Sequence, residues 1–481
     1  MNNIIKYALL ALALFSKNTI ISQNLKVNDT ILIKKQDLEE VIVSAFRASK
    51  DTPMSFIEID AKDIAPLNLG QDLPTILNFT PSVVTHSDAG NGVGYSAMHI
   101  RGSDETRVNV TLNGIPLNDS ESQLVYWVNM PDLSSSISNI QIQRGVGTST
   151  NGSGAFGGSI NILTDIHSDY PLTEISNSFG SFGTLKNSIK FSTGLSINKI
   201  EFSGRFSNIS SDGYIDRASS DLKSYFLQGI YETENTVIKI LNFAGHEITY
   251  QSWYGIDSFQ LKKNRNYNPA GEIYDENGNK TGFYNNQVDN YKQNHIQILW
   301  DQEINSLINL SFGYNFTHGY GFYEEYNDKW YVENISFGNE TDFKYLNLKP
   351  FELGNMIVSG TENITQKWLD NYFHVLTLRL NYSKNSTKLN FGGIYAIYDG
   401  DHYGSLIWGQ NIPYDLINNK FYENKGIKKE LSFFVKLNKT MNSKTFIYLD
   451  AQIRTLNYSI DGTIKGPELF KVNDSFIFFN P

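Results

Sequence analysis

Residues 307–317 read LINLSFGYNFT, a stretch in which two kinds of residue alternate without a break from Ile308 onward. Every second residue is apolar or aromatic, and every residue between is polar or glycine. Successive side chains of a β-strand point to opposite faces, so one face of this strand meets an apolar medium and the other a polar one. The segments 199–206, 372–382 and 431–439 behave similarly. The alternation predicts strands, but it does not distinguish lipid from a protein core.

The connections between these strands favour lipid over a protein core as the apolar medium. Short turns lie at about 194–198, 232–235, 302–306, 383–387 and 439–444, and long excursions lie between them at about 209–221, 251–288, 318–370 and 401–426. Tight turns at one rim and long loops at the other are typical of an up-and-down transmembrane barrel. Strand-like stretches of ten or more residues also match the roughly 9–11 that cross a bilayer at a tilt. A soluble β-sandwich or an adhesin remains an alternative.

The chain changes character near residue 170. Before it, short elements are separated by Gly, Pro, Asn and Asp clusters, which indicates a compact mixed domain over residues 49–166. We expect a helix around 70–79 and strands at 97–100, 108–112, 137–143 and 159–163. After it, about 11 or 12 strands fill residues 170–481. The predicted fold is mainly β: a small α+β domain followed by a partial antiparallel transmembrane β-barrel.

Composition and the N-terminus fit an exported protein. Residues 1–22 have the layout of a signal peptide, with Lys6 before a short apolar run. No later apolar stretch reaches the ~18 residues that a transmembrane helix needs, so a membrane form must be a closed barrel. The chain has no cysteine, which excludes disulfides and thiolate sites. A net charge of -10 argues against a nucleic-acid partner.

Each possible motif for catalysis or cofactor binding in this sequence lacks a residue or a structural context that its chemistry needs. Residues 152–157 match GxGxxG, but a strand pattern follows where a dinucleotide fold needs a helix. No Gly-Lys dipeptide occurs, which excludes a P-loop, and His246-Glu247 lacks the second histidine of a zincin. We therefore expect no catalytic residue, no cofactor, no resident metal and no enzyme activity.

Three segments resemble TonB-dependent outer-membrane receptors. Residues 39–45 resemble the TonB box of that family, and residues 100–102 with 108–116 resemble the core of its plug domain. Residues 140–145 and 154–162 resemble the end of the plug. The predicted TonB box consists of Glu39, Glu40, Val41, Ile42, Val43, Ser44 and Ala45, within a periplasmic segment at 23–48. The resemblance implies a 22-stranded barrel filled by the plug, of which this chain supplies about half.

The resemblance also implies a function in the bacterial outer membrane. It implies energy-coupled uptake of a scarce ligand, such as a ferric siderophore or another iron chelate, with haem and cobalamin as further candidates. The box would add as a strand to TonB, which the ExbB/ExbD system energises. Import of a glycan with the help of a surface lipoprotein is the alternative within the family. A passive porin or an adhesin barrel is the alternative outside it.

Two sets of residues are predicted to carry this function. Arg101 and Arg144 each precede a glycine and are candidates for locking the plug to the barrel wall, because arginine forms geometrically fixed pairs with carboxylates. The candidate ligand contacts are His86, Tyr95, Tyr126, Trp127, Trp253 and Tyr254. Aromatic faces there would sandwich a flat chelate, although packing within loops would explain them nearly as well.

Overall fold

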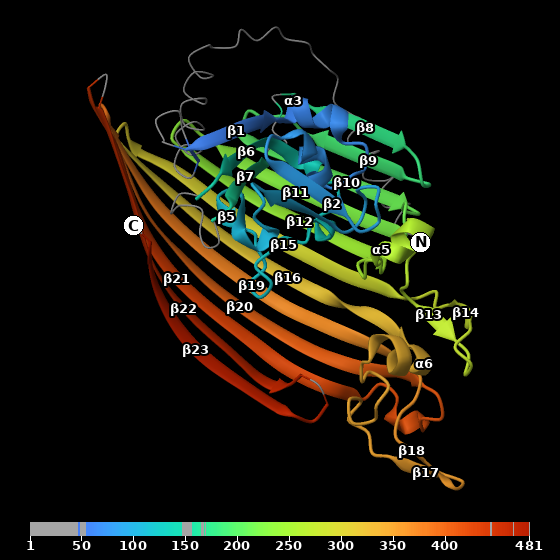
Figure 1. Cartoon of the computed structure of the whole chain (residues 1–481). Helices are drawn as coiled ribbons and strands as arrows, with labels where there is room; N and C mark the ends of the chain where they lie inside the picture. The colour runs from blue at the N-terminus through green and yellow to red at the C-terminus, as the bar shows by residue number, and fades with distance from the viewer. Residues whose placement is uncertain are drawn as a thin grey trace.

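The computed structural model places a small domain against one face of a wide, curved sheet (Figure 1). It describes residues 47–48, 54–146, 156–164, 168, 170–442, 445–464 and 466–480. The predicted signal peptide at 1–22 and the predicted TonB box at 39–45 lie outside the described residues. We call the small domain the plug domain and the wide sheet the barrel sheet.

The plug domain is built on a five-stranded sheet with the order β1-β6-β7-β4-β5. Its strands are β1 (Ser55–Asp60), β4 (Val108–Leu112), β5 (Ile115–Pro116), β6 (Ile137–Arg144) and β7 (Gly158–Thr164). Among the described residues of this sheet, only the pairing of β4 with β7 is parallel. Ile100, Ile140 and Ile160 are fully buried in its core, next to Phe226 and Phe243 of the barrel sheet. The plug domain and the barrel sheet therefore share one apolar core.

Helices are short in the plug domain. The predicted helix around 70–79 is a single turn, α4 (Leu73–Ile76), continued by a 3₁₀ turn over Leu77–Phe79. Pro74 lies in its first turn, and Pro81 follows it, so the backbone has no room to extend the helix. The other α-helical turn is α3 (Ala61–Ile64). A separate hairpin, β2 (Val83–Ser87) with β3 (Ser96–Ile100), carries the turn at residues 88–95.

In the part of the chain that the structure describes, the barrel sheet has twelve antiparallel strands, and each pairs with the strand of this sheet that comes next in the sequence. They are β8 (Leu172–Phe179), β9 (Leu185–Ser192), β10 (Ile200–Ser211), β11 (Ser220–Glu232), β12 (Thr236–Tyr250), β15 (Val288–Asn305), β16 (Ile308–Asn327), β19 (Asn363–Lys384), β20 (Thr387–Gly409), β21 (Lys420–Asn442), β22 (Thr445–Thr463) and β23 (Leu469–Asn480). The predicted fold class, a small α+β domain followed by antiparallel barrel strands, is confirmed. Among the described residues, no helix is both long and apolar enough to cross a membrane.

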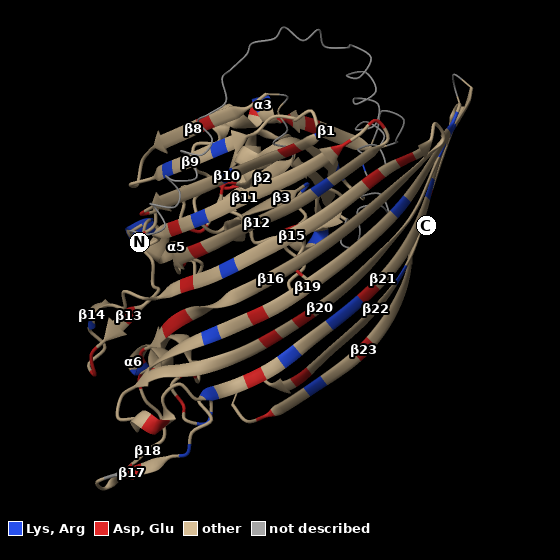
Figure 2. Ribbon diagram, turned by 180° about the vertical axis from the view of Figure 1, so that it is seen from behind, with Lys and Arg blue, Asp and Glu red and all other residues tan. Residues whose placement is uncertain are grey.

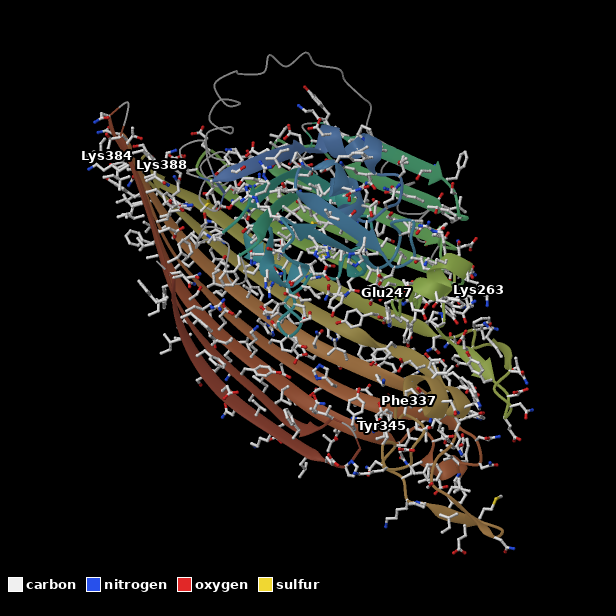
Figure 3. The ribbon with its side chains drawn as sticks, viewed as in Figure 1. Glu247, Lys263, Phe337, Tyr345, Lys384 and Lys388 are labelled. Carbon is white, nitrogen blue, oxygen red and sulfur yellow. The ribbon has the colours of Figure 1, made fainter. Side chains whose placement is uncertain are left out.

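Turns and loops separate to opposite ends of the strands. Lys384 and Lys388 flank the two-residue turn between β19 and β20 at one end, while Lys263, Phe337 and Tyr345 lie in the loop region at the other (Figure 3). The loop after β12 contains α5 (Ser258–Lys263) and the hairpin β13 (Glu272–Tyr274) with β14 (Lys280–Phe283). The loop after β16 contains α6 (Lys329–Tyr331), a π-helical turn over Val332–Ser336, and the hairpin β17 (Phe351–Leu353) with β18 (Met356–Val358).

Several strands run further than their alternation predicts. β16 continues to Asn327 and β19 begins at Asn363, so the loop expected at 318–370 is much shorter. β20 and β21 extend in the same way into the excursion expected at 401–426. Backbone pairing persists there because it needs only neighbouring strands, whereas strict alternation is needed only where one face is apolar.

Burial in the barrel sheet is inverted with respect to a soluble protein. On β10, Arg205 is 2% exposed and faces the plug domain, whereas Phe202 and Phe206 are 61% and 49% exposed on the outer face. On β16, Ser311 and Asn315 are likewise buried while Phe312 is not. Basic and acidic positions are interspersed along the strands and do not form a band of one sign (Figure 2). The apolar side of the alternation therefore points away from the protein.

Candidate functional site

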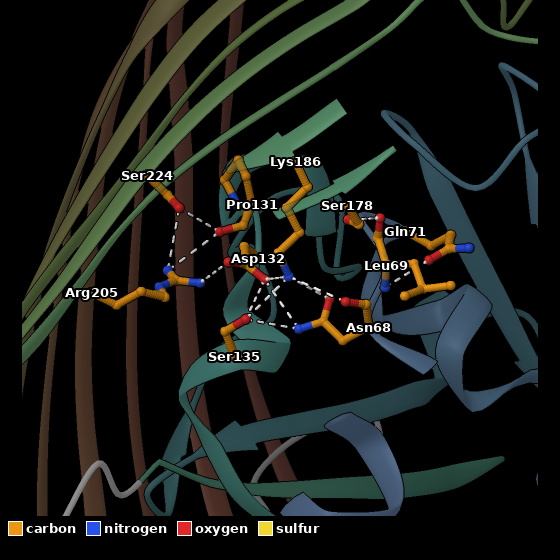
Figure 4. A network of polar contacts seen from close by, with 10 residues as sticks. All are labelled: Asn68, Leu69, Gln71, Pro131, Asp132, Ser135, Ser178, Lys186, Arg205 and Ser224. Carbon is orange, nitrogen blue, oxygen red and sulfur yellow. Dashed lines mark hydrogen bonds and ion pairs between the residues drawn. The ribbon is translucent and has the colours of Figure 1, made fainter. Parts of the chain in front are cut away.

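Asp132 of the plug domain is bound by two cations of the barrel sheet (Figure 4). Lys186 Nζ on β9 lies 2.5 Å from Asp132 Oδ1, and Arg205 Nη1 on β10 lies 3.1 Å from Oδ2. The side chains of the cations are 2% exposed and that of Asp132 is 0% exposed. We call these three residues the Asp132 lock.

The surroundings of the Asp132 lock supply its remaining hydrogen bonds. Lys186 also donates to Asn68 Oδ1 at 2.9 Å and to Ser135 Oγ at 3.2 Å. Ser224 on β11 donates to the carbonyl of Pro131 at 2.7 Å. Burial alone would raise the pKa of the Asp132 carboxyl, but the charges of Arg205 and Lys186 outweigh it and hold this pKa well below its ordinary value. Asp132 therefore stays ionised between its two cations.

A second group of contacts ties a plug loop to later strands. Glu121 accepts a hydrogen bond from Tyr398 at 3.1 Å and pairs with His402 Nε2 at 2.8 Å, both on β20. Lys428 on β21 donates to the carbonyl of Ser120 at 2.6 Å. Contacts at both sides of the plug domain hold it in one position against the sheet.

Arg101 and Arg144 belong neither to the Asp132 lock nor to the contacts around Glu121. Arg144 donates to Ser55 Oγ at 2.7 Å, which joins β6 to β1 inside the plug domain. Arg101 is exposed at a turn after β3, with φ of 52°. Neither contacts the barrel sheet in the part of the chain that the structure describes, so their role as a lock stays a prediction.

Sequence reasoning missed the Asp132 lock. Arg205 stood on the polar face of the alternation at 199–206, which was a usable signal. Asp132 gave none, because a single acid after a proline is typical of a surface turn.

A cavity of about 560 Å³ lies where the plug domain meets the long loops. Its walls come from plug turns, the loop after β12, and strands β15, β16, β19, β20 and β21. Aromatic side chains form much of the lining: Tyr95, Tyr126, Trp253, Tyr291, Phe322, Tyr323, Trp368 and Tyr422. This volume is in the range of small-molecule sites. We call it the apical cavity.

Three of the six candidate ligand residues meet in the apical cavity. The rings of Tyr95 and Tyr126 pack edge to face at 6.4 Å, and those of Tyr95 and Trp253 do so at 5.4 Å. Tyr254 lies beside Trp253 but lines a neighbouring cavity of about 290 Å³ in the loops. Tyr95, Tyr126 and Trp253 were predicted as contacts of one ligand, but no local pattern predicted that their rings would pack against one another.

The other two candidates do not line the apical cavity. Trp127 is 4% exposed, because its 3₁₀ turn directs the indole into the core of the plug domain. His86 is exposed on β2, 5.7 Å from the ring of His99. Core packing accounts for Trp127, and a role of either residue in ligand contact rests on the sequence alone.

The hydroxyl of Tyr95 connects the plug domain to the wall of the cavity. It donates to Asp289 Oδ2 on β15 at 2.5 Å and lies 3.3 Å from Glu247 Oε1 on β12. Glu247 lies at the edge of the plug domain in Figure 3. Burial, together with the charges of Asp289 and Glu247, raises the pKa of Tyr95 well above its ordinary value. Tyr95 therefore stays a neutral donor in the wall of the cavity.

Comparison with protein families matches residues 48–159 to the TonB-dependent Receptor Plug Domain. Comparison with curated proteins gives no match. Among solved structures, the chain is similar to the ferric yersiniabactin uptake receptor FyuA from Yersinia pestis, with a TM-score of 0.61, 11% identity, and coverage of 89% of this chain and 61% of that one. It is also similar to the ferric-catecholate import receptor Fiu from K12 E. coli, with a TM-score of 0.62, 13% identity, and coverage of 90% and 63%.

The chain is similar in the same way to the ferric citrate transporter FecA in its unliganded form, with a TM-score of 0.61, 11% identity, and coverage of 89% of this chain and 60% of that one. Identities at this level show the fold alone. The chain spans about three fifths of the length of these receptors.

Proposed function

We propose that this chain, which has the plug domain and the plug-and-barrel fold of TonB-dependent receptors, takes up a scarce ligand across the bacterial outer membrane with energy from TonB. Receptors with this domain are transporters and not enzymes. The ligand we propose is a ferric siderophore or another iron chelate, with haem and cobalamin as further candidates.

The apical cavity is the observation that carries the proposal. Tyr95 and Tyr126 reach it from the plug domain, and Trp253 reaches it from a long loop. A ligand in this cavity contacts both parts of the receptor at once, so binding can change how the plug domain sits against the barrel sheet. A porin has no need of such a joint site.

The inverted burial of the barrel sheet supports a place in the outer membrane. An exposed apolar face costs free energy in water, whereas in lipid it is the stable arrangement. The strands of the barrel sheet from β10 to β23 have 12 to 23 residues and are also long enough to cross a bilayer at a tilt.

The Asp132 lock supports energy coupling. A plug domain held by buried ion pairs blocks passive flow until work is done on it. TonB, energised by ExbB/ExbD, would supply that work through the box at residues 39–45, to which it would pair as an added strand.

The choice of an iron chelate rests on likeness alone. FyuA, FecA and Fiu are described as a ferric yersiniabactin receptor, a ferric citrate transporter and a ferric-catecholate receptor, and OprC is described as a copper transporter. Import of a glycan would use the same plug domain.

Deletion of residues 39–45 tests the proposal. We expect cells carrying the deletion to bind a radiolabelled iron chelate at the surface but to accumulate none. A deletion of seven residues at 27–33, in the same segment, is the control and should leave accumulation unchanged. Accumulation that survives loss of residues 39–45 would contradict energy-coupled transport.

A further inference from the structure

The charges around the apical cavity are unbalanced. Three carboxylates line it: Asp88 and Asp119 from the plug domain, and Asp289 from β15. Two basic side chains, Lys367 and His402, line it as well. The count of charged side chains alone gives the lining a small surplus of negative charge.

Both basic side chains already have an acidic partner. Lys367 Nζ lies 2.8 Å from Glu325 Oε2, and His402 Nε2 lies 2.8 Å from Glu121 Oε2. Their charges are compensated by carboxylates that do not line the cavity. Neither of them forms an ion pair with Asp88, Asp119 or Asp289.

Asp289 and Asp119 take their hydrogen bonds from neutral donors, whereas the charge of His86 acts on Asp88 and opposes the rise that burial causes in its pKa. Asp289 accepts from the hydroxyl of Tyr95 at 2.5 Å, and Asp119 accepts from the backbone N–H groups of Glu121 and Ser122 at 3.0 and 2.7 Å. No Lys or Arg lies within ion-pair distance of Asp88, Asp119 or Asp289 among the described residues. Neutral donors hold these carboxylates in place but leave their charge.

The charge of these carboxylates also acts on Tyr126, which lines the same cavity. Burial raises the pKa of Tyr126, and the charges of Asp119, Asp289 and Glu105 raise it further, although a hydrogen bond with Ser122 opposes them. Half-buried carboxylates of one sign destabilise each other unless a cation joins them.

The aromatic lining favours the same kind of ligand. Trp253 packs edge to face with both Tyr95 at 5.4 Å and Tyr323 at 6.5 Å. Indole and phenol faces attract a cation through their negative quadrupole, and they do so more strongly out of water. Carboxylates and aromatic faces that share one cavity of about 560 Å³ are complementary to an organic cation.

We propose that the apical cavity selects a chelate that carries a positively charged group, such as a protonated amine, and discriminates against anionic chelates. This inference rests on the proposed uptake function. The three lining carboxylates would repel an anionic chelate, and a neutral sugar would not balance their charge.

A pair of probes that differ in one charge tests the proposal. The first is ferrioxamine B, a ferric tris-hydroxamate with a free terminal ammonium group, and the second is the same complex with that amine acetylated. Binding to the receptor in outer-membrane vesicles is measured by equilibrium dialysis at low salt. We expect the ammonium form to bind at least about tenfold more tightly. That preference should shrink as salt is added, because dissolved ions screen the attraction between the ammonium group and the half-exposed carboxylates.

Two isosteric variants identify the carboxylates responsible. Asp289→Asn keeps an oxygen that accepts from Tyr95, and Asp88→Asn changes a plug side chain that is half-exposed, so folding is not at risk. Each should reduce the preference for the ammonium form several-fold, and together they should bring it close to one. Asp415→Asn, an exposed carboxylate in a loop away from the cavity, is the matched control and should keep it.

The possible outcomes distinguish a failure of this proposal from a failure of the proposed uptake function on which it rests. Equal binding of both ferrioxamines, or tighter binding of a ferric tris-catecholate with its threefold negative charge, overturns the charge selection and leaves iron uptake standing. Binding of a neutral oligosaccharide with no binding of any iron chelate overturns both. A preference that both variants keep in full overturns the assignment to Asp88 and Asp289.

Discussion

Lys186 of β9 and Asp132 of the plug domain form an ion pair of 2.5 Å in which neither side chain is more than 2% exposed. The two residues lie 54 positions apart and belong to different parts of the fold. Arg205 completes the group on the other carboxylate oxygen. Charges this deeply buried are stable only together, so the plug domain and the first strands of the barrel sheet are expected to hold or release one another as a unit.

Asp132→Ala should loosen the plug domain. It leaves Lys186 and Arg205 buried without their anion, which costs about 3–5 kcal/mol. Hydrogen exchange of residues 54–146 should rise in membrane-reconstituted protein. Asp221→Ala, which breaks an exposed pair with Lys223 at 2.9 Å, should change stability by less than about 1 kcal/mol and serves as the control. Unchanged exchange in Asp132→Ala would show that the lock is not what holds the plug domain.

Acid should release the plug domain through the same residue. The pKa of Asp132 is lower in the folded protein than in the unfolded chain, despite its burial, because of Arg205 and Lys186. Its contribution to stability is therefore complete above the unfolded value of about 4 and is lost as pH falls below that value. Unfolding curves between pH 2 and 7 should show this loss in the parent protein. Asp132→Asn should lack it, and an equally steep acid dependence in that variant would argue for other groups.

Tyr95→Phe should weaken the contact between the plug domain and the wall of the apical cavity. The ring remains, but Asp289 and Glu247 lose a hydroxyl that is 2.5 and 3.3 Å from their oxygens. Loss of a buried donor costs about 1–3 kcal/mol. Exchange protection of the β2–β3 hairpin is the measurement. Tyr414→Phe, where the phenol is 89% exposed, should leave protection unchanged.

Trp253→Ala should reduce ligand affinity about tenfold or more. The indole packs against Tyr95 and forms part of the cavity wall, and large aromatic contacts dominate binding energy in such sites. Binding of an iron chelate to outer-membrane vesicles measures the effect. Phe259→Ala removes an aromatic ring from the same loop, 75% exposed in α5, and should bind as the parent does. Equal losses in both variants would indicate disruption of the loop.

Affinity for a cationic ligand should rise with pH around neutrality. Burial raises the pKa of Glu105, and the charges of Asp88 and Asp104 raise it further, to about 7. Above pH 7 the carboxyl is ionised and adds to the negative charge around Tyr126, so a cation binds more tightly there than at pH 6. The charge of His86 acts on Asp88, so the dependence on pH is compared in Glu105→Gln and in His86→Gln. Glu105→Gln should remove most of the dependence of affinity on pH. If only His86→Gln removes it, the dependence arises from the histidine and not from Glu105.

Much of the fold follows from local patterns. The alternation in residues 307–317 predicts a strand because side chains of neighbouring residues must point to opposite faces, and β16 contains that stretch from Ile308 onward. The plug motif at 100–116 likewise lies in the region that matches the plug family, and so does the motif at 140–162 except for its last three residues. What local patterns did not give was the length of the strands beyond the apolar band, where pairing between strands sets the limit.

The sequence by itself determined the two kinds of domain, their order and the polar face of the barrel sheet, because each depends on residues close together in the chain. Only the tertiary structure decided that Asp132 meets Lys186 and Arg205, and that Tyr95, Tyr126 and Trp253 enclose one cavity. Those contacts depend on the register and curvature of twelve strands and on how the plug domain docks against them. A small displacement of any strand would give these side chains different partners, and no short stretch of sequence records which displacement the packing selects.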